Sequence, residues 1–313
     1  FSPGIRFIES LALWLHQLEP QERPIAYDFV RHRLIFVSER EMLHLVEVAY
    51  PDFIRPELIE AAARETDLDW WRVRAVTATR EFTALLRSSL FLGLSDGAHT
   101  AHFRRSNPGL SNEQVWGTYD LSAERANDML QELRRDLGTD GQFRFVFLLD
   151  DFSGSGKSYI RDLGDGGKLC RIWDRAHDEK HNMCRAISPD STWYLVLYLS
   201  TEKAQTYLRQ AIKDRLGGQV QLIAVHTVPD GIAEAVKTDK DLVAVCEAHF
   251  DSGLVDSHYR KGDVTHPHLG FDGCALPLVL YHNAPNNSLP LLWHESDEFN
   301  ALFPRVSRHR SER

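Results

Sequence analysis

The sequence has few cysteines and no paired cysteine motif. Cys170, Cys184, Cys246 and Cys274 are the four cysteines among 313 residues, and no two of them form a C-x-x-C pair. This pattern excludes a zinc ribbon and a dithiol redox motif. It favours free thiols in a reducing compartment, and we therefore expect a cytoplasmic protein.

The sequence also lacks long apolar runs and an excess of positive charge. No run approaches the roughly 18 apolar residues that cross a bilayer, so we expect no membrane-spanning segment. The formal net charge of −9 disfavours broad binding to a nucleic-acid backbone, and a nucleic acid is considered only as an acceptor in a reaction. Apolar and charged fractions of 43% and 26% are typical of a globular protein.

The spacing of apolar residues changes near residue 87. Before that point they recur at helical spacing, as at Ile8, Leu11, Leu15 and Leu18, which predicts a helical region over 1–86. After it, short apolar runs alternate with helical segments, and these runs cover 88–94, 145–149, 193–199, 220–225 and 275–281. The alternation predicts an α/β domain over 87–313 with a mainly parallel sheet and helices on both faces.

The most informative segment is FVFLLDDFSGSGKS, residues 145–158. Its apolar run is typical of a buried parallel strand, and Asp150 and Asp151 follow where open α/β sheets bind ligands. The loop after the two aspartates consists of Phe152, Ser153, Gly154, Ser155, Gly156, Lys157 and Ser158. Its small residues allow backbone N–H groups to face a phosphate, and we expect Ser158 to begin a helix whose N-terminus adds to that attraction.

Two phosphate-binding families compete for this segment. Gly156-Lys157-Ser158 matches the end of a Walker A loop, but the first glycine of that loop would fall at position 151, where Asp151 carries a negative charge. The strand, the two aspartates and Ser155-Gly156-Lys157-Ser158 together resemble the signature of type I phosphoribosyltransferases, with serine in place of both threonines. We favour this resemblance over a Walker A loop and over a plain strand-to-helix turn.

The resemblance implies a role for each part of the segment. In that family the adjacent acidic residues, here Asp150 and Asp151, bind the 2′- and 3′-hydroxyls of 5-phosphoribosyl-1-diphosphate (PRPP). The loop over 152–158 would then surround the 5′-phosphate. The resemblance also implies Mg²⁺ as cofactor, held mostly by the oxygens of the substrate and not by direct protein ligands.

A second small loop, Ser95-Asp96-Gly97, follows the first expected strand of the sheet. It should lie on the same edge as Asp150, where a phosphoribosyltransferase needs a loop for the diphosphate. Gly97 permits a close approach of the backbone, and the Ser95 hydroxyl is a hydrogen-bond donor. Asp96 fits less well, because a carboxylate beside a diphosphate must be bridged by a metal or turned away. The alternative is an exposed, capped turn.

An asparagine-rich loop follows the last expected strand. Asn283, Asn286 and Asn287 stand among prolines, which predicts a rigid loop rich in hydrogen bonds. With the helical start and the two loops described above, this segment resembles the phosphoribosyltransferase-like proteins predicted in bacterial conflict and anti-phage systems. That resemblance implies that the three asparagines form part of a hood over the acceptor; the alternative is a purely structural turn.

The leading hypothesis is a Mg²⁺-dependent phosphoribosyltransferase of anti-phage defence that moves ribose 5-phosphate from PRPP to an acceptor and releases diphosphate. The second is a catalytically degenerate sensor that binds PRPP or a nucleotide and signals to a partner protein through the helical N-terminal region. The third is ATP hydrolysis through Gly156-Lys157-Ser158. The sequence does not identify the acceptor.

Overall fold

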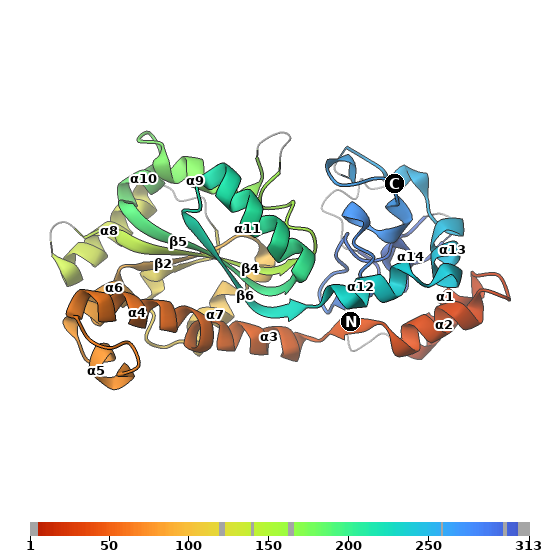
Figure 1. The fold of residues 1–313 in the computed structure, drawn as a ribbon, viewed down its shortest axis with the longest axis horizontal. Helices are drawn as coiled ribbons and strands as arrows, with labels where there is room; N and C mark the ends of the chain where they lie inside the picture. Colours follow the sequence, from red (N-terminus) through yellow and green to blue (C-terminus); the bar gives the residue numbers. More distant parts are fainter. Residues whose placement is uncertain are drawn as a thin grey trace. The chain divides into compact units, whose positions relative to one another are not determined.

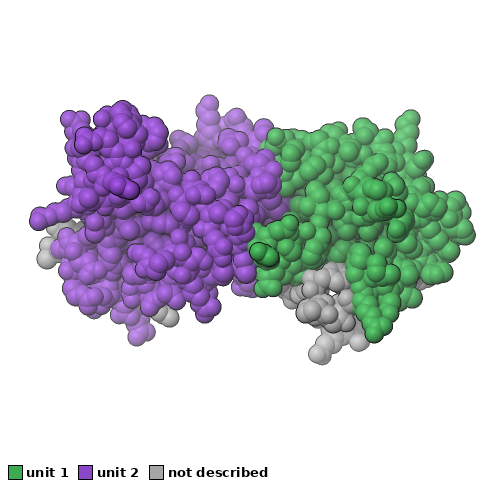
Figure 2. Space-filling model, turned by 90° about the horizontal axis from the view of Figure 1, so that it is seen from below, with its two compact units in different colours: residues 1–41, 201–203, 228–313 green, residues 42–200, 204–227 purple. Residues whose placement is uncertain are grey.

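The computed structural model describes residues 6–118, 123–138, 141–161, 166–257, 259–296 and 299–305. The chain forms two compact units, which Figure 2 distinguishes by colour. Unit 1 contains residues 1–41, 201–203 and 228–313, and unit 2 contains residues 42–200 and 204–227. The domain boundary expected at residue 86 therefore falls within unit 2.

A five-stranded parallel sheet forms the centre of unit 2 and confirms the predicted fold class. Its strands are β2 (Ser89–Gly93), β3 (Val115–Trp116), β4 (Phe143–Ser153), β5 (Ile187–Thr201) and β6 (Val220–Val228). They lie in the order β3-β2-β4-β5-β6, and Figure 1 labels β2, β4, β5 and β6. Strand β4 pairs with β2 as far as Leu149, opposite Gly93, and with β5 as far as Ser153, opposite Ser200.

The two faces of this sheet carry different side chains, because successive residues of a strand point to opposite faces. One face is largely aliphatic and forms a single core with four helices, α8 (Ala123–Leu137), α9 (Lys168–His177), α10 (Asn182–Ala186) and α11 (Glu202–Leu216). The other face is aromatic. There the Phe147 ring stacks on Phe91 and Tyr194, with centroid distances of 5.1 and 4.8 Å.

Helices from the N-terminal region cover the aromatic face. The Tyr194 hydroxyl donates to Glu57 at 3.0 Å, and the Phe91 ring contacts Phe103 with a centroid distance of 5.3 Å. The helices between residues 39 and 114, some before and some after β2 in the chain, are α3 (Glu39–Val48), the π-helix η1 (Ala49–Ile54), α4 (Arg55–Thr66), α5 (Val73–Thr77), α6 (Arg80–Arg87), η2 (Asp96–Ala98), α7 (Thr100–Ser106) and η3 (Asn112–Gln114). Of the helices expected before residue 87, those in unit 2 thus belong to the α/β fold, whereas α1 (Phe7–His16) and α2 (Arg23–His32) belong to unit 1.

Unit 1 joins the first and last parts of the chain. Its elements are α1 (Phe7–His16), α2 (Arg23–His32), β1 (Ile35–Val37), α12 (Asp230–Lys237), α13 (Lys240–Ala248), η4 (Ser252–Leu254), η5 (Tyr259–Lys261), η6 (Pro267–Leu269), η7 (Phe271–Gly273), β7 (Leu278–Leu280) and α14 (Pro290–Trp293). Buried Trp14 donates from its indole to the carbonyl of Leu291 at 3.2 Å. The strand expected over 275–281 is β7, which pairs in parallel with β1 in a separate two-stranded sheet.

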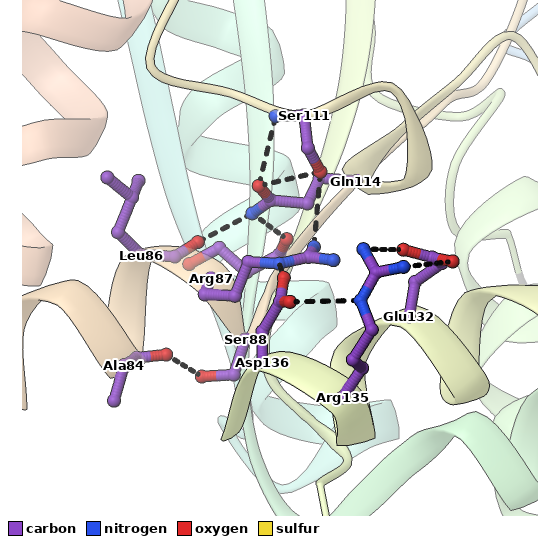
Figure 3. A network of polar contacts seen from close by, with 10 residues as sticks. Ala84, Leu86, Arg87, Ser88, Ser111, Gln114, Glu132, Arg135 and Asp136 are labelled. Carbon is purple, nitrogen blue, oxygen red and sulfur yellow. Dashed lines mark hydrogen bonds and ion pairs between the residues drawn. The ribbon is translucent and has the colours of Figure 1, made fainter. Parts of the chain in front are cut away.

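A polar network fixes the start of β2 in unit 2 (Figure 3). The buried Gln114 side chain donates to the carbonyls of Leu86 and Ser89 at 2.6 and 2.9 Å. Arg87 donates to Asp136 at 2.6 Å. Because buried carbonyls need a hydrogen-bond partner, the Gln114 amide satisfies the backbone at the junction between α6 and β2.

We predict that Gln114→Leu lowers the free energy of unfolding by about 2 to 4 kcal/mol, because it leaves two carbonyls without a donor. Urea denaturation followed by circular dichroism measures this loss. Gln210→Leu is the matched control, since Gln210 lies exposed on α11 and bonds only its i+4 neighbour Asp214, so it should change the free energy by less than about 0.5 kcal/mol. Equal effects of the two substitutions would contradict the structural role of Gln114.

Candidate functional site

The carboxyl ends of β2 and β4 meet where the sheet reverses its order. Of the five strands of this sheet, β2 comes first in the chain, and β3 lies on one side of it and β4 on the other. Doubly wound sheets bind ligands in the crevice outside such a point. Ser95 follows β2, and Asp150 and Asp151 lie in the last part of β4, so the structure brings the two loops picked out in the sequence to one edge.

Asp150 is buried and accepts hydrogen bonds from three side chains. Its own side chain is 2% exposed. The Ser95 hydroxyl donates to Oδ1, while Oδ2 accepts from the Tyr159 hydroxyl at 2.8 Å and from the Lys168 ammonium at 3.1 Å. A buried ionised carboxylate is costly unless it is paired, and these donors from three separate segments provide that pairing.

The electrostatics of Asp150 follow from its surroundings. Burial and the nearby charge of Asp151 raise the pKa of Asp150, and the Lys168 charge and the hydrogen bonds from Ser95 and Tyr159 act against that rise. Burial and the Asp150 charge also hold the pKa of Tyr159 well above its usual value. The Tyr159 phenol therefore keeps its proton at neutral pH and remains a donor.

Asp151 is half-buried and packs against the backbone of Gly97. A Cβ atom placed on Gly97 would lie 2.2 Å from Oδ2 of Asp151, far inside van der Waals contact. The backbone N–H of Phe152 donates to Oδ1 of Asp151 at 2.8 Å. The neighbouring Asp96 is exposed. Gly97 thus allows a close approach between the two loops; contact of this turn with a ligand stays a prediction.

The predicted phosphate loop packs tightly on helix α11. Gly154 and the side chains of Ser153 and Ser155 are buried, and the Ser153 hydroxyl accepts from the backbone N–H of Gly156 at 3.2 Å. Gly156 has a φ of +79°, in the left-handed region that favours glycine. Phe152 and Lys157 are half-buried and Ser158 is exposed.

The helix expected to begin at Ser158 is absent, and that prediction is wrong. Residues 157–159 form a turn, and helix α9 begins only at Lys168. The turn is closed by hydrogen bonds from Tyr159 N and Ile160 N to the Gly156 carbonyl. A Walker A loop leads directly into a helix that faces the phosphates, so this geometry weighs against the ATP-binding alternative.

Sequence reasoning missed two residues of this edge, Tyr159 and Lys168. Tyr159 lies nine positions and Lys168 eighteen positions after Asp150, so neither falls within the signature. The one sequence signal is the pair Gly166-Gly167 directly before Lys168. A Cβ atom on Gly167 would lie 2.4 Å from the Tyr159 carbonyl oxygen, so only glycine allows α9 to start this close to the loop.

The asparagine-rich loop belongs to unit 1 and follows β7. Asn287 is buried, and its amide donates to the Phe271 carbonyl at 3.2 Å and to Cys274 Sγ at 3.3 Å. Asn283 closes a turn through two backbone hydrogen bonds with Leu280, and the Asn286 carbonyl accepts from Phe271 N at 2.7 Å. These bonds give the loop a structural role; contact with an acceptor remains a prediction.

The described part of the chain shows neither a metal-binding cluster nor a helix that could span a membrane. There, no three His, Cys, Asp or Glu residues are grouped so as to hold a metal ion. Both oxygens of Asp150 already accept hydrogen bonds, and a Mg²⁺ held mainly by substrate oxygens stays a prediction. Among the same residues, no helix has both the length and the apolar character to span a bilayer.

Comparison with known protein families gives a match over most of the chain. The family model PRTase-CE matches residues 11–305, which include both loops of the site and the asparagine-rich loop. Neither the curated proteins nor the solved structures contain a significant match.

The tight packing of Gly156 can be separated from its backbone conformation by substitution. A Cβ atom on Gly156 would lie 2.7 Å from Tyr207 Cδ1 and 2.9 Å from Leu208 Cγ, whereas Gly218, with a similar φ of +74°, has nothing within 4 Å. We predict that Gly218→Ala lowers the free energy of unfolding by about 1 kcal/mol through backbone strain alone. Gly156→Ala should lower it by about 2 to 4 kcal/mol, since overpacking adds to the strain. Equal losses in urea denaturation would contradict the contact with α11.

Asp150 and Asp136 should show opposite pH dependence of stability. The pKa of Asp150 is raised, so the folded protein binds its proton more tightly than the unfolded chain, and its contribution to stability falls as the pH rises above about 4. The hydrogen bond from Arg87 lowers the pKa of Asp136, whose contribution is present above about pH 4 and is lost as the pH falls through the folded pKa.

Urea denaturation of the wild type, Asp150→Asn and Asp136→Asn between about pH 3 and 7 tests this pair. The stability of the wild type relative to Asp150→Asn should decrease with rising pH. Its stability relative to Asp136→Asn should increase. If both stability differences changed in the same direction with rising pH, the burial that we assign to Asp150 would be ruled out.

Proposed function

The chain belongs to the PRTase-CE family, the phosphoribosyltransferases of conflict systems, and we propose that it transfers ribose 5-phosphate from PRPP to an acceptor nucleophile in a Mg²⁺-dependent reaction that releases diphosphate. One observation carries the proposal. Ser95 and Gly97 contact Asp150 and Asp151 at the edge where the sheet reverses its order, so the two segments that a ribose diphosphate needs lie together.

Each part of this edge has a role in the proposed reaction. Asp150 and Asp151 fix the ribose 2′- and 3′-hydroxyls and favour the positive charge that develops at C1′ in an oxocarbenium-like transition state. Backbone N–H groups of the loop over 152–158 hold the 5′-phosphate. Ser95 and the backbone at Gly97 face the diphosphate, and Asp96, which is exposed, turns away from it.

The reaction needs positioning more than covalent chemistry by the protein. The bond between C1′ and the diphosphate oxygen breaks, and diphosphate leaves with the electron pair. A bond forms between C1′ and the acceptor, which loses its proton to solvent. Mg²⁺ bound to the diphosphate would neutralise the charge of the leaving group. The protein contributes a fixed carboxylate pair on a rigid strand.

We further propose that the protein acts in bacterial anti-phage defence, in the cytoplasm and with a partner protein. Trp70 and Trp71, between α4 and α5, are 57% and 63% exposed. They are followed by exposed Arg72 and Arg74, and tryptophan and arginine dominate the binding energy of many protein interfaces. This exposed group supports a partner site in the helical N-terminal region.

The acceptor side of the reaction is assigned to the asparagine-rich loop. We propose contact with the acceptor for Asn283, Asn286 and Asn287, as the family resemblance implies, and the Asn287 amide also bonds inside unit 1. Mass spectrometry of small molecules and RNA after incubation with labelled PRPP would identify the acceptor.

A sensor without transferase activity is the second candidate function. The observation that favours it is the occupation of both Asp150 oxygens by protein donors, which limits the contact that Asp150 can make with a ribose hydroxyl. Calorimetry with PRPP and Mg²⁺, followed by an assay of diphosphate release, separates the two functions. Binding without release supports the sensor, and release supports the transferase.

We predict that Asp151→Asn lowers the rate of diphosphate release by about 10²- to 10³-fold, as is typical for loss of one group that stabilises a transition state. The fold should be retained, because Asp151 is half-buried at the end of β4. Asp214→Asn, at an exposed position of α11, is the matched control and should leave the rate unchanged. Turnover at the wild-type rate by Asp151→Asn would exclude the proposed role of this residue.

A further inference from the structure

The three partners of Asp150 differ in charge and in burial. Tyr159 is 1% exposed and Ser95 is half-buried, and both are neutral donors. Lys168 is charged and its side chain is 29% exposed, and its bond to Oδ2 at 3.1 Å is longer than that of Tyr159 at 2.8 Å. If Lys168 left, Asp150 would keep Ser95 on Oδ1 and Tyr159 on Oδ2. Lys168 is therefore the exchangeable partner.

On the basis of the proposed function, we infer that Lys168 is a phosphate-binding residue that pairs with Asp150 only until a phosphorylated ligand arrives. In the bound state its ammonium contacts phosphoryl oxygens of the ligand. Asp150 accepts a ligand hydroxyl in its place. Before binding, Asp150 therefore takes the place of the phosphate as the partner of Lys168. In the same way, Lys168 takes the place of the ligand hydroxyl as the partner of Asp150.

The balance of charge at this edge supports the exchange. Asp150 and Asp151 are two adjacent carboxylates at the site, and a phosphorylated ligand adds more negative charge, which must be balanced by cations. While Lys168 stays on Asp150, its charge compensates the carboxylate. Transfer of the ammonium to the phosphate neutralises the ligand and also restores the negative charge that would stabilise a cationic sugar.

The backbone keeps Lys168 next to the phosphate loop. Lys168 N donates to the Ser158 carbonyl at 3.0 Å, and Leu169 N donates to the Tyr159 carbonyl at 2.9 Å. The start of α9 and the end of the loop are therefore joined by hydrogen bonds. We expect the exchange to proceed by rotation about the side-chain bonds of Lys168.

Calorimetric titration of Lys168→Met tests this inference. The variant should bind PRPP with Mg²⁺ about 10- to 100-fold more weakly than the wild type, the range for loss of a charge-assisted hydrogen bond. Inorganic phosphate and inorganic diphosphate, titrated separately, distinguish the 5′-phosphate from the diphosphate as the group that Lys168 contacts. Lys213→Met, at an exposed position of α11, is the control and should bind PRPP within about twofold of the wild type.

The double variant Asp150→Asn/Lys168→Met separates ligand contact from a structural role. It removes both charges together, so it avoids an unpaired buried carboxylate and should fold. If Lys168 contacts the anion, the double variant stays weakened for the inorganic anion that the single variant has lost. If Lys168 serves only to neutralise Asp150, the double variant binds that anion as tightly as the wild type or more tightly, which overturns the inference.

These titrations distinguish a failure of this inference from a failure of the proposed function. Wild-type protein that binds neither PRPP nor an inorganic anion would overturn both. Wild-type protein that binds PRPP while Lys168→Met binds it equally well would overturn the role of Lys168 alone.

Discussion

The buried carboxylate of Asp150 is the interaction on which the site depends. An ionised group that is 2% exposed must be paired within the protein. Its partners come from the turn after β2, the end of the phosphate loop and the start of α9. One charge on a central strand therefore fixes three segments that would otherwise be independent loops, and it does so at the edge of the sheet that open α/β folds use for ligands.

The sheet supplies the rigidity that this arrangement needs. Strand β4 is paired on both sides, and its pairing with β5 continues past the aspartates to Ser153. The carboxylates therefore lie on regular strand and not on a mobile loop. Glycine provides the remaining fit: Gly97 lets the turn after β2 touch Asp151, Gly156 lets the phosphate loop pack on α11, and Gly167 brings α9 to Tyr159.

The division of the chain into two units does not follow the order of the sequence. Helices α1 and α2 and strand β1 fold with the C-terminal segment, whereas α4 to α7 cover the aromatic face of the main sheet. The N-terminal helical region is thus divided between the units. Unit 2 holds the residues assigned to PRPP, and unit 1 holds the asparagine-rich loop.

The sequence by itself determined the α/β class, the strand that carries Asp150 and Asp151, and the family signature, because these depend on local apolar runs and on short spacings. It failed at Ser158, where hydrogen bonds to Gly156 close a turn in place of a helix, and it gave no sign of Tyr159 or Lys168. The pairing of Lys168 with Asp150 was decided by the tertiary structure alone. A buried charge selects its partners by distance in space, and no spacing along the chain encodes that distance.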